Sequence, residues 1–211
     1  MDQIRPIIVD FTGSHSTGKT TAIDFVRGMV KLFNEDNAGR VHFTCNAVSS
    51  ISRTYLEEQK LKIYGDVDDF SQAWITFGNI SNILESVRNY DITLCTDLAI
   101  RNLAYTLSSP HAGDATARFH VNMLLHFQSP LFTSQVDLYR FYLPVEFPVV
   151  PDGVRHENEV YRKDVDDRIK RILEDYEVSH TVLTGSESMR NVCLNVFINS
   201  LIANRVFMLG R

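Results

Sequence analysis

The segment Gly13–Thr20, with the sequence GSHSTGKT, restricts the fold of this chain more than any other feature. It matches the pattern G-x-x-x-x-G-K-[S/T], in which backbone N–H groups surround phosphate oxygens at the start of a helix. The apolar run PIIVDFT precedes it, and apolar residues at helical spacing follow it. A strand, this loop and a helix in succession predict a P-loop within an α/β fold.

The P-loop pattern also predicts what its residues bind. Gly13 and Gly18 permit backbone conformations that residues with a Cβ atom resist. Lys19 is expected to reach the β- and γ-phosphates of ATP, and Thr20 to offer its hydroxyl to Mg²⁺. The predicted nucleotide-binding residues are Gly13, Ser14, His15, Ser16, Thr17, Gly18, Lys19, Thr20 and Thr21.

Strand and helix patterns alternate along the rest of the chain. Strands separated by helices imply a parallel sheet with helices on both faces. Short apolar runs predict strands at 6–12, 41–45, 91–96, 136–143 and 180–184. Helical spacing predicts helices after the P-loop, after residue 97, at 48–63, 69–89, 115–128 and 158–176, and from about 187.

Length and composition indicate one domain, residues 1–211. No run of eighteen apolar residues exists, and the N-terminus lacks signal-peptide features, so we expect no membrane association. Three widely spaced cysteines in apolar segments are typical of reduced core thiols, which favours a cytoplasmic location. The formal net charge of −5 argues mildly against a dedicated nucleic-acid binder.

Two motifs that the chain lacks limit the class of P-loop protein to which it can belong. A GTPase should carry N-K-x-D to recognise guanine, and a transport ATPase should carry a signature similar to L-S-G-G-Q. Neither tetrapeptide nor signature occurs in the sequence. The single-domain layout is typical of a small-molecule kinase.

Asp97 follows the strand predicted at 91–96, where ligands bind in open α/β sheets. A carboxylate there could hold Mg²⁺ or accept the proton of an attacking hydroxyl. The alternative is an N-cap for the helix that follows, a role that Asp also favours. Arg101 lies one turn further on and could bind an acceptor phosphate or remain solvated.

Basic residues cluster between 151 and 171, and the segment opens with the turn sequence PDG. A kinase needs cations over the transferring phosphoryl group, often on a mobile lid. We predict a lid-like segment at about 152–168, with Arg155 and Arg162 as catalytic cations. The alternative is a solvated helix face, to which Lys170 and Arg171 would belong.

The segments FTGSHSTGKTT, SRTYLEE, TDLAIRNLAY, PDGVRHENEVYRKDVDDRIKRIL and VLTGS occur in an order that resembles the NadR-like P-loop kinases, which include ribosylnicotinamide kinase domains. The resemblance spans nearly the whole chain and implies a five-stranded parallel sheet with order 2-3-1-4-5. It implies phosphate and Mg²⁺ roles for Lys19 and Thr20, an acceptor-side role for Asp97, and lid roles for Arg155 and Arg162. It also implies that Gly185 and Ser186 lie beside the adenine.

One position departs from that family. After the second strand, relatives carry an acid three residues before an arginine, whereas here Ser50 precedes Arg53. A serine cannot act as a carboxylate base, so the acidic role falls on Asp97. Phe70, Trp74 and Phe77 recur at helical spacing and could stack on a base or belong to the core. The predicted acceptor-binding residues are Arg53, Arg101 and Trp74.

The sequence therefore predicts an ATP- and Mg²⁺-dependent kinase that phosphorylates a hydroxyl of a nucleoside, a nucleotide or a related base-bearing acceptor. Two alternatives remain open. One is a kinase for a hydroxymethylated base in DNA, such as 5-hydroxymethyluracil, with DNA as its substrate. The other is a nucleotide-binding switch or interaction protein without small-molecule kinase activity.

Overall fold

The computed structural model describes residues 5–37, 41–58, 68–96, 98–149 and 158–209. Its strands are β1 (Ile7–Thr12), β2 (Cys45–Ala47), β3 (Ile92–Cys95), β4 (Asp137–Tyr142) and β5 (Thr181–Val182). Its helices are α1 (Lys19–Asp36), α2 (Ser52–Glu58), α3 (Asp69–Asn89), α4 (Ile100–Ser108), α5 (Asp114–Gln128), α6 (Pro130–Thr133), α7 (Glu159–Asp175) and α8 (Glu187–Leu209).

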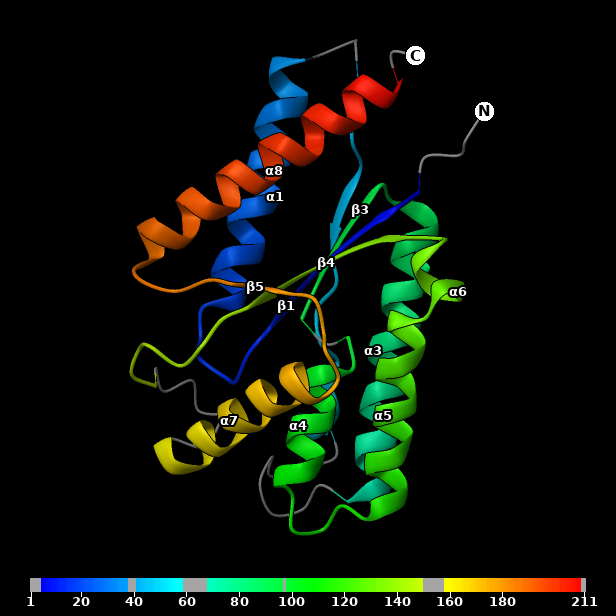
Figure 1. The fold of residues 1–211 in the computed structure, drawn as a ribbon, viewed down its shortest axis with the longest axis vertical. Helices are drawn as coiled ribbons and strands as arrows, with labels where there is room; N and C mark the ends of the chain where they lie inside the picture. Colours follow the sequence, from blue (N-terminus) through cyan, green and yellow to red (C-terminus); the bar gives the residue numbers. More distant parts are fainter. Residues whose placement is uncertain (1–4, 38–40, 59–67, 97, 150–157, 210–211) are drawn as a thin grey trace.

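The five strands form one parallel sheet with the order β2-β3-β1-β4-β5 (Figure 1). This is the order that the family resemblance implied, and it is confirmed. β1 occupies the centre of the sheet, and all six of its residues are buried. The loop that leaves its carboxyl end is therefore attached to the most enclosed strand of the fold.

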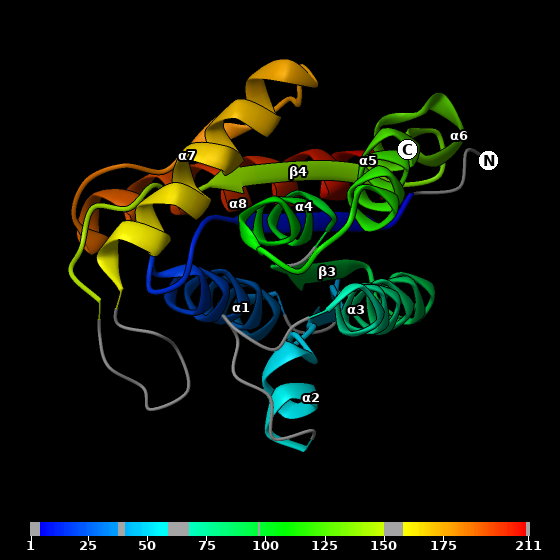
Figure 2. The same cartoon turned by 90° about the horizontal axis from the view of Figure 1, so that it is seen from below.

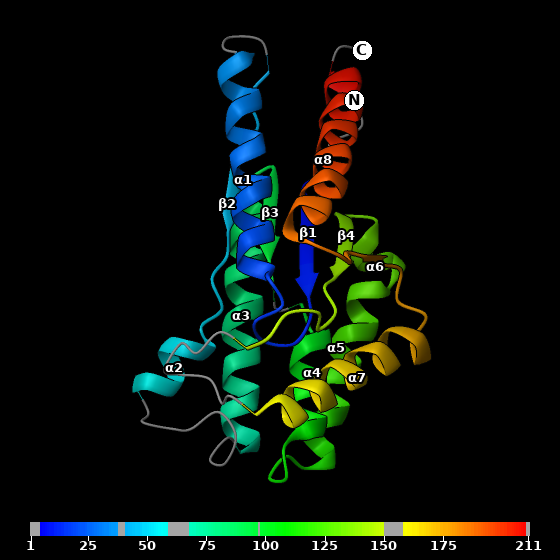
Figure 3. The same cartoon turned by 90° about the vertical axis from the view of Figure 1, so that its left-hand side faces the viewer.

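Helices cover both faces of the sheet, as the alternating patterns predicted. α1 and α8 pack side by side on one face (Figure 3). Their buried stripes, which include Val26, Val30, Leu194 and Ile198, share a core with Phe11 of β1. α3, α4, α5 and α7 supply the core on the opposite face. α2 projects beside α1 and α3 (Figure 2).

The second strand begins later than the sequence predicted, at Cys45 rather than at 41. Side chains satisfy the backbone of the preceding residues instead. Asn34 donates to the carbonyl of Phe43 and accepts from its N–H, both at 2.9 Å, and the N–H of Thr44 donates to Asp91 at 2.7 Å. Because these groups are already bonded, sheet pairing begins only at the carbonyl of Thr44, which accepts from Ile92.

Two further local predictions need correction. The short helix α6 was not predicted, although its Pro130 lies at the first helical position, where proline is favoured. Cys193 is exposed, so it is not a core thiol, whereas Cys95 is buried and Cys45 is half-buried. All three cysteines are free thiols, and burial raises the pKa of Cys45 to about 11.

By length and composition alone, the segment Glu187–Met208 of α8 is long and apolar enough to cross a membrane. The core helices of soluble proteins also reach this length and hydropathy. Here the inner face of α8, with Leu194, Ile198 and Leu201, packs in the core against α1. The cytoplasmic location stays a prediction.

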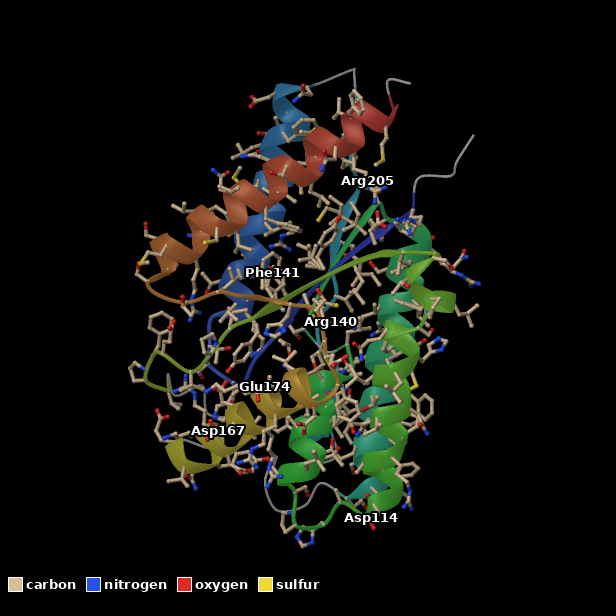
Figure 4. The ribbon with its side chains drawn as sticks, in the orientation of Figure 1. Asp114, Arg140, Phe141, Asp167, Glu174 and Arg205 are labelled. Atoms are coloured by element: carbon tan, nitrogen blue, oxygen red, sulfur yellow. The ribbon has the colours of Figure 1, made fainter. Side chains whose placement is uncertain are left out.

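A buried charge pair joins the strand that enters the P-loop to its neighbour. Asp10 on β1 lies in register with Arg140 on β4, and Arg140 Nε is 3.9 Å from Asp10 Oδ2. Burial lowers the pKa of Arg140, and the nearby Asp10 carboxylate opposes that shift. Figure 4 shows Arg140 in the middle of the molecule, near the sheet. The pair thus links the two strands just before the loop begins.

Candidate active site

The P-loop connects Thr12, the last residue of β1, to Lys19, the first residue of α1. Gly13 adopts φ 154°, and a Cβ atom there would lie 2.5 Å from the carbonyl oxygen of Leu143. Gly18 adopts φ 88° as the N-cap of α1. Both positions therefore require glycine, which explains the spacing of the two glycines in the motif.

Lys19 is buried inside the loop that precedes it. Its Nζ donates to the carbonyls of Gly13, at 2.9 Å, and of Ser14, and lies 3.3 Å from Thr17 Oγ1. A positive charge is thus held among the loop's peptide groups at the N-terminus of α1. Both the charge and the positive end of the helix favour an anion at this place.

A cavity of about 490 Å³ opens from the P-loop toward the carboxyl ends of β2 and β3. Ser50 lies in it, and its Oγ accepts from Arg101 Nη2 at 3.3 Å and lies 2.8 Å from Ser52 Oγ. The structure therefore brings the predicted acceptor residue Arg101 into the same cavity as the P-loop. Its lining includes Ser16, Thr17, Gly18, Lys19, Thr20, Thr21, Arg27, Ser49, Ser50, Ser52, Thr96 and Arg101.

A second cavity, of about 400 Å³, lies on the other side of the P-loop, against α8 and the segment after β4. Phe147, Pro148 and Arg190 form much of its wall, and the Arg190 guanidinium carbon lies 4.7 Å from the centre of the Phe147 ring. A flat, partly apolar wall of this kind suits a nucleobase. The predicted adenine residues Gly185 and Ser186 immediately precede α8, whose first residue, Glu187, lines this cavity, but they do not line it themselves.

Arg162 is fully buried on α7. Its Nε donates to the carbonyl of His15 and its Nη2 to the carbonyl of Ser16, both at 3.0 Å. Its Nη1 donates to the carbonyl of Phe147 at 2.7 Å and pairs with Glu159 at 3.2 Å. This placement differs from that of a lid cation, because the guanidinium contacts the backbone of the P-loop.

The first part of α7 belongs to the packed fold, with Val165 and Asp166 buried beside Arg162. This part covers 159–168 of the predicted lid-like segment. Residues 152–157, with the predicted catalytic Arg155, lie outside the described residues. Asp97 also lies outside them, but it follows Thr96, which lines the larger cavity.

The other two predicted acceptor residues are Arg53 and Trp74. The backbone of Arg53 lies in α2, and its side chain is outside the described residues. Trp74 is 54% exposed and lines neither cavity. Its ring lies 6.3 Å from that of Tyr55 and 6.4 Å from that of Phe70. These aromatic residues of α3 are not core, because Phe70 and Phe77 are exposed as well.

Arg190 was missed by the sequence reasoning. It is buried on α8, donates from Nη1 to the carbonyl of Thr17 at 2.6 Å, and pairs through Nη2 with Glu146 at 2.7 Å. A signal for it exists in the sequence. Arg190 continues the helical spacing of the buried residues Leu194 and Ile198, so it lies on the inner face of α8.

A magnesium site at the P-loop fits the residues that are present. Thr20 is exposed on the first turn of α1 and lines the larger cavity. Within the described part of the chain, no group of three His, Cys, Asp or Glu side chains could hold a metal by itself. Mg²⁺ takes few protein ligands and binds largely to water and phosphate oxygens, so a single hydroxyl such as that of Thr20 is the kind of ligand it would use here.

The sheet order, the loop between β1 and α1, and a cavity at the carboxyl ends of the strands define a P-loop fold with kinase-like topology. Solved structures of NadR share it. NadR protein in complex with NAD and AMP-PNP matches with a TM-score of 0.60 and 16% identity, over 90% of this chain and 48% of that chain. NadR protein in complex with NR matches with a TM-score of 0.56 and 15% identity, over 86% and 44%.

The resemblance to NadR-like kinases is thus confirmed at the level of the fold. This chain spans about half the length of these NadR structures. No protein-family model and no curated protein matches the sequence.

Proposed function

We propose that this protein is an ATP- and Mg²⁺-dependent kinase that transfers the γ-phosphate to a hydroxyl of a nucleoside, a nucleotide or a related base-bearing acceptor. The observation that carries the proposal is the position of the P-loop. The loop holds Lys19 at the N-terminus of α1, between the two cavities. The smaller cavity suits the base of ATP, and the larger one leaves room for an acceptor. NadR, which shares the fold, binds AMP-PNP and NR.

In this proposal, the P-loop holds the phosphates of ATP and Lys19 offsets the charge of the β- and γ-phosphates. Bound Mg²⁺ would neutralise phosphate charge, and Thr20 would hold it, with Asp97 as a second candidate ligand. The wall of Phe147 and Pro148 would contact the adenine. The reacting phosphorus would then face the larger cavity.

The transfer step needs a nucleophile and a base. The acceptor oxygen forms a bond with the γ-phosphorus while the bond from that phosphorus to the β–γ bridging oxygen breaks, and ADP leaves. The proton of the acceptor hydroxyl passes to Asp97, since Ser50 cannot serve as a carboxylate base. Arg101, bonded to Ser50, would orient the acceptor. Arg155 keeps its proposed role as a cation near the transferring phosphoryl group.

A panel of acceptors tests the proposal. Phosphate transfer from γ-labelled ATP is measured for nucleosides, nucleoside monophosphates and short oligonucleotides, with Lys19→Ala as the inactive control. Labelled product from at least one base-bearing acceptor, absent with Lys19→Ala, supports the proposal. ATP binding with no transfer to any member of the panel would favour the nucleotide switch instead.

A second candidate, a kinase for a hydroxymethylated base in DNA, is favoured by the exposed rings of Phe70 and Trp74, beside which the half-buried Tyr55 lies. Exposed rings of this kind stack on the bases of single strands. Tyr55 lies on α2, three residues after Ser52, which lines the larger cavity. Transfer to an oligonucleotide containing 5-hydroxymethyluracil, with binding that weakens steeply as salt rises, would support it. Trp74→Ala should then reduce oligonucleotide binding without changing ATP affinity.

A further inference from the structure

The carbonyl groups of the P-loop are all engaged from Gly13 to Gly18. Lys19 takes the first two, as described above, and the carbonyl of Gly18 accepts from Ala22 N at 3.0 Å within α1. The three between them, on His15, Ser16 and Thr17, are held by arginines from distant helices. Two come from Arg162 of α7 and one from Arg190 of α8. The outer side of the loop is therefore clamped by two buried guanidinium groups.

Peptide geometry gives this clamp a consequence for the inner side. In a trans peptide, the N–H of one residue points opposite to the carbonyl of the residue before it. The carbonyls of His15, Ser16 and Thr17 point at the arginines, so the N–H groups of residues 16, 17 and 18 point away from them. Ser16, Thr17 and Gly18 all line the larger cavity. The clamp therefore orients N–H donors in the direction that a bound phosphate needs.

Backbone strain shows that the loop needs such support. Ser16 adopts φ 54°, a left-handed conformation that is unfavourable for a residue with a Cβ atom. Strained residues persist where surrounding contacts over-determine them. At Ser16 the contact is the Nη2 donor of Arg162, and Ser14 Oγ returns a hydrogen bond to the carbonyl of Arg162 at 3.0 Å. The helix and the loop thus hold each other.

We infer that Arg162 and Arg190 are positioning residues that hold the P-loop carbonyls outward, so that its N–H groups bind a triphosphate. Neither guanidinium needs to touch the phosphate for this role. A charged donor also polarises the peptide groups it binds, which strengthens their N–H groups as donors. The inference rests on the proposed function for its ligand, a nucleoside triphosphate, and replaces a lid role for Arg162 with a positioning role at the same loop.

The test compares two probes, inorganic tripolyphosphate and adenosine, whose binding is measured by calorimetry on the full chain. Arg162→Lys keeps the charge but loses the planar fork that donates to His15 and Ser16 together. Arg162 lines neither cavity, so this variant should bind tripolyphosphate at least about tenfold more weakly and adenosine within about twofold of the wild type. Arg190→Lys should also weaken tripolyphosphate binding, with an added loss for adenosine because Arg190 lines the smaller cavity.

Arg205→Lys is the matched control. Arg205 is another buried arginine of α8 and pairs with Asp137 at 2.5 Å. It lies near the C-terminal end of α8, at the opposite end of the helix from Arg190 (Figure 4). Its replacement should lower the thermal midpoint without changing tripolyphosphate affinity. If Arg162 and Arg190 contributed to stability alone, their lysine variants would also show a lower thermal midpoint with unchanged tripolyphosphate affinity. That result would overturn the inference.

If Arg162→Lys does not fold, Glu159→Gln supplies a milder perturbation. Glu159 is largely exposed and contacts Arg162 Nη1, so its loss should weaken tripolyphosphate binding by about two- to threefold. Unchanged binding in both Glu159→Gln and Arg190→Lys would then overturn the inference.

The outcomes also separate the inference from the proposed function. Wild-type protein that binds tripolyphosphate but phosphorylates no acceptor refutes the kinase and leaves the clamp standing. If Arg162→Lys and Arg190→Lys keep both kinase activity and tripolyphosphate affinity, the clamp is refuted and the proposed kinase function still stands.

Discussion

His120 offers a sharp test of how the helical layer is held together. It lies on α5 with no exposed surface. Its Nε2 is 2.7 Å from Thr76 Oγ1 on α3, and its Nδ1 is 2.9 Å from Thr106 Oγ1 on α4. Hydroxyls can donate or accept, so a neutral ring is satisfied in either tautomer. Burial lowers the pKa of His120 from 6.5 to about 4, because the buried site disfavours the imidazolium.

The sign of the pH effect follows from that shift. The unfolded chain takes up a proton at His120 as the pH falls through 6.5, whereas the folded protein does so only near pH 4. The stability contributed by His120 is therefore complete above pH 6.5 and declines as the pH falls. With these two pKa values the loss is about 2 kcal/mol at pH 5 and approaches about 3 kcal/mol below pH 4.

The assay is urea unfolding of the wild type and of His120→Gln at intervals between pH 7.5 and 5. This window lies above the range where Asp68, Asp69, Asp164 and Glu159 titrate, since the pKa of each of these carboxyls is lowered. The wild type should lose about 2 kcal/mol across the window. The variant should be less stable at pH 7.5 but lose much less on acidification, because it lacks the imidazole.

His42→Gln, which removes an exposed imidazole, is the control and should follow the wild type. Equal pH slopes in the wild type and in His120→Gln would refute the argument. So would a direct NMR titration of the folded protein that placed the pKa of His120 near 6.5.

Three further predictions concern the P-loop and its base. Lys19→Ala should still fold and should lower phosphate transfer by at least about two decades; full turnover in the folded variant would remove the assignment of the ATP site. Asp97→Asn should keep ATP affinity by calorimetry and lower kcat by about two to four decades, and a parallel loss of both would make Asp97 a metal or structural residue. Gly13→Ala should destabilise the fold by more than about 1 kcal/mol, since its Cβ would meet the Leu143 carbonyl. Gly28→Ala, in open space on α1, should slightly stabilise it.

Local patterns in the sequence were enough to predict the P-loop and the α/β fold class. The P-loop depends on glycines at two positions and on a strand and a helix on either side, and all of these can be recognised within about thirty residues. The structure has the loop between β1 and α1, as predicted. The parallel sheet followed because a helix between two strands returns the chain to the edge where the first strand began, so that the next strand runs parallel to it. The order of the strands, by contrast, came from the family resemblance.

Element boundaries were less predictable, because side chains far along the chain decide them. Val41 to Cys45 has the composition of a strand, yet pairing starts at its end. The side chains of Asn34 and Asp91 form hydrogen bonds with the backbone of Phe43 and Thr44, so these backbone groups are not available for strand pairing. The aromatic residues of α3 show the same limit, because helical spacing describes one face of a helix without saying whether another element covers it. Trp74 and its neighbours are uncovered within the described residues.

At the candidate active site, the sequence alone was enough to predict which residues would meet the phosphates, since the chemistry of GSHSTGKT is local. Only the tertiary structure decided what holds that loop in shape. Arg162 and Arg190 reach the loop across 147 and 173 residues of sequence, respectively. Their position on the buried faces of α7 and α8 could be suspected from helical spacing. Their hydrogen-bond partners in the loop could not be predicted from the sequence. The packing of whole helices against the sheet places each guanidinium, and no local pattern links residues so far apart in the chain.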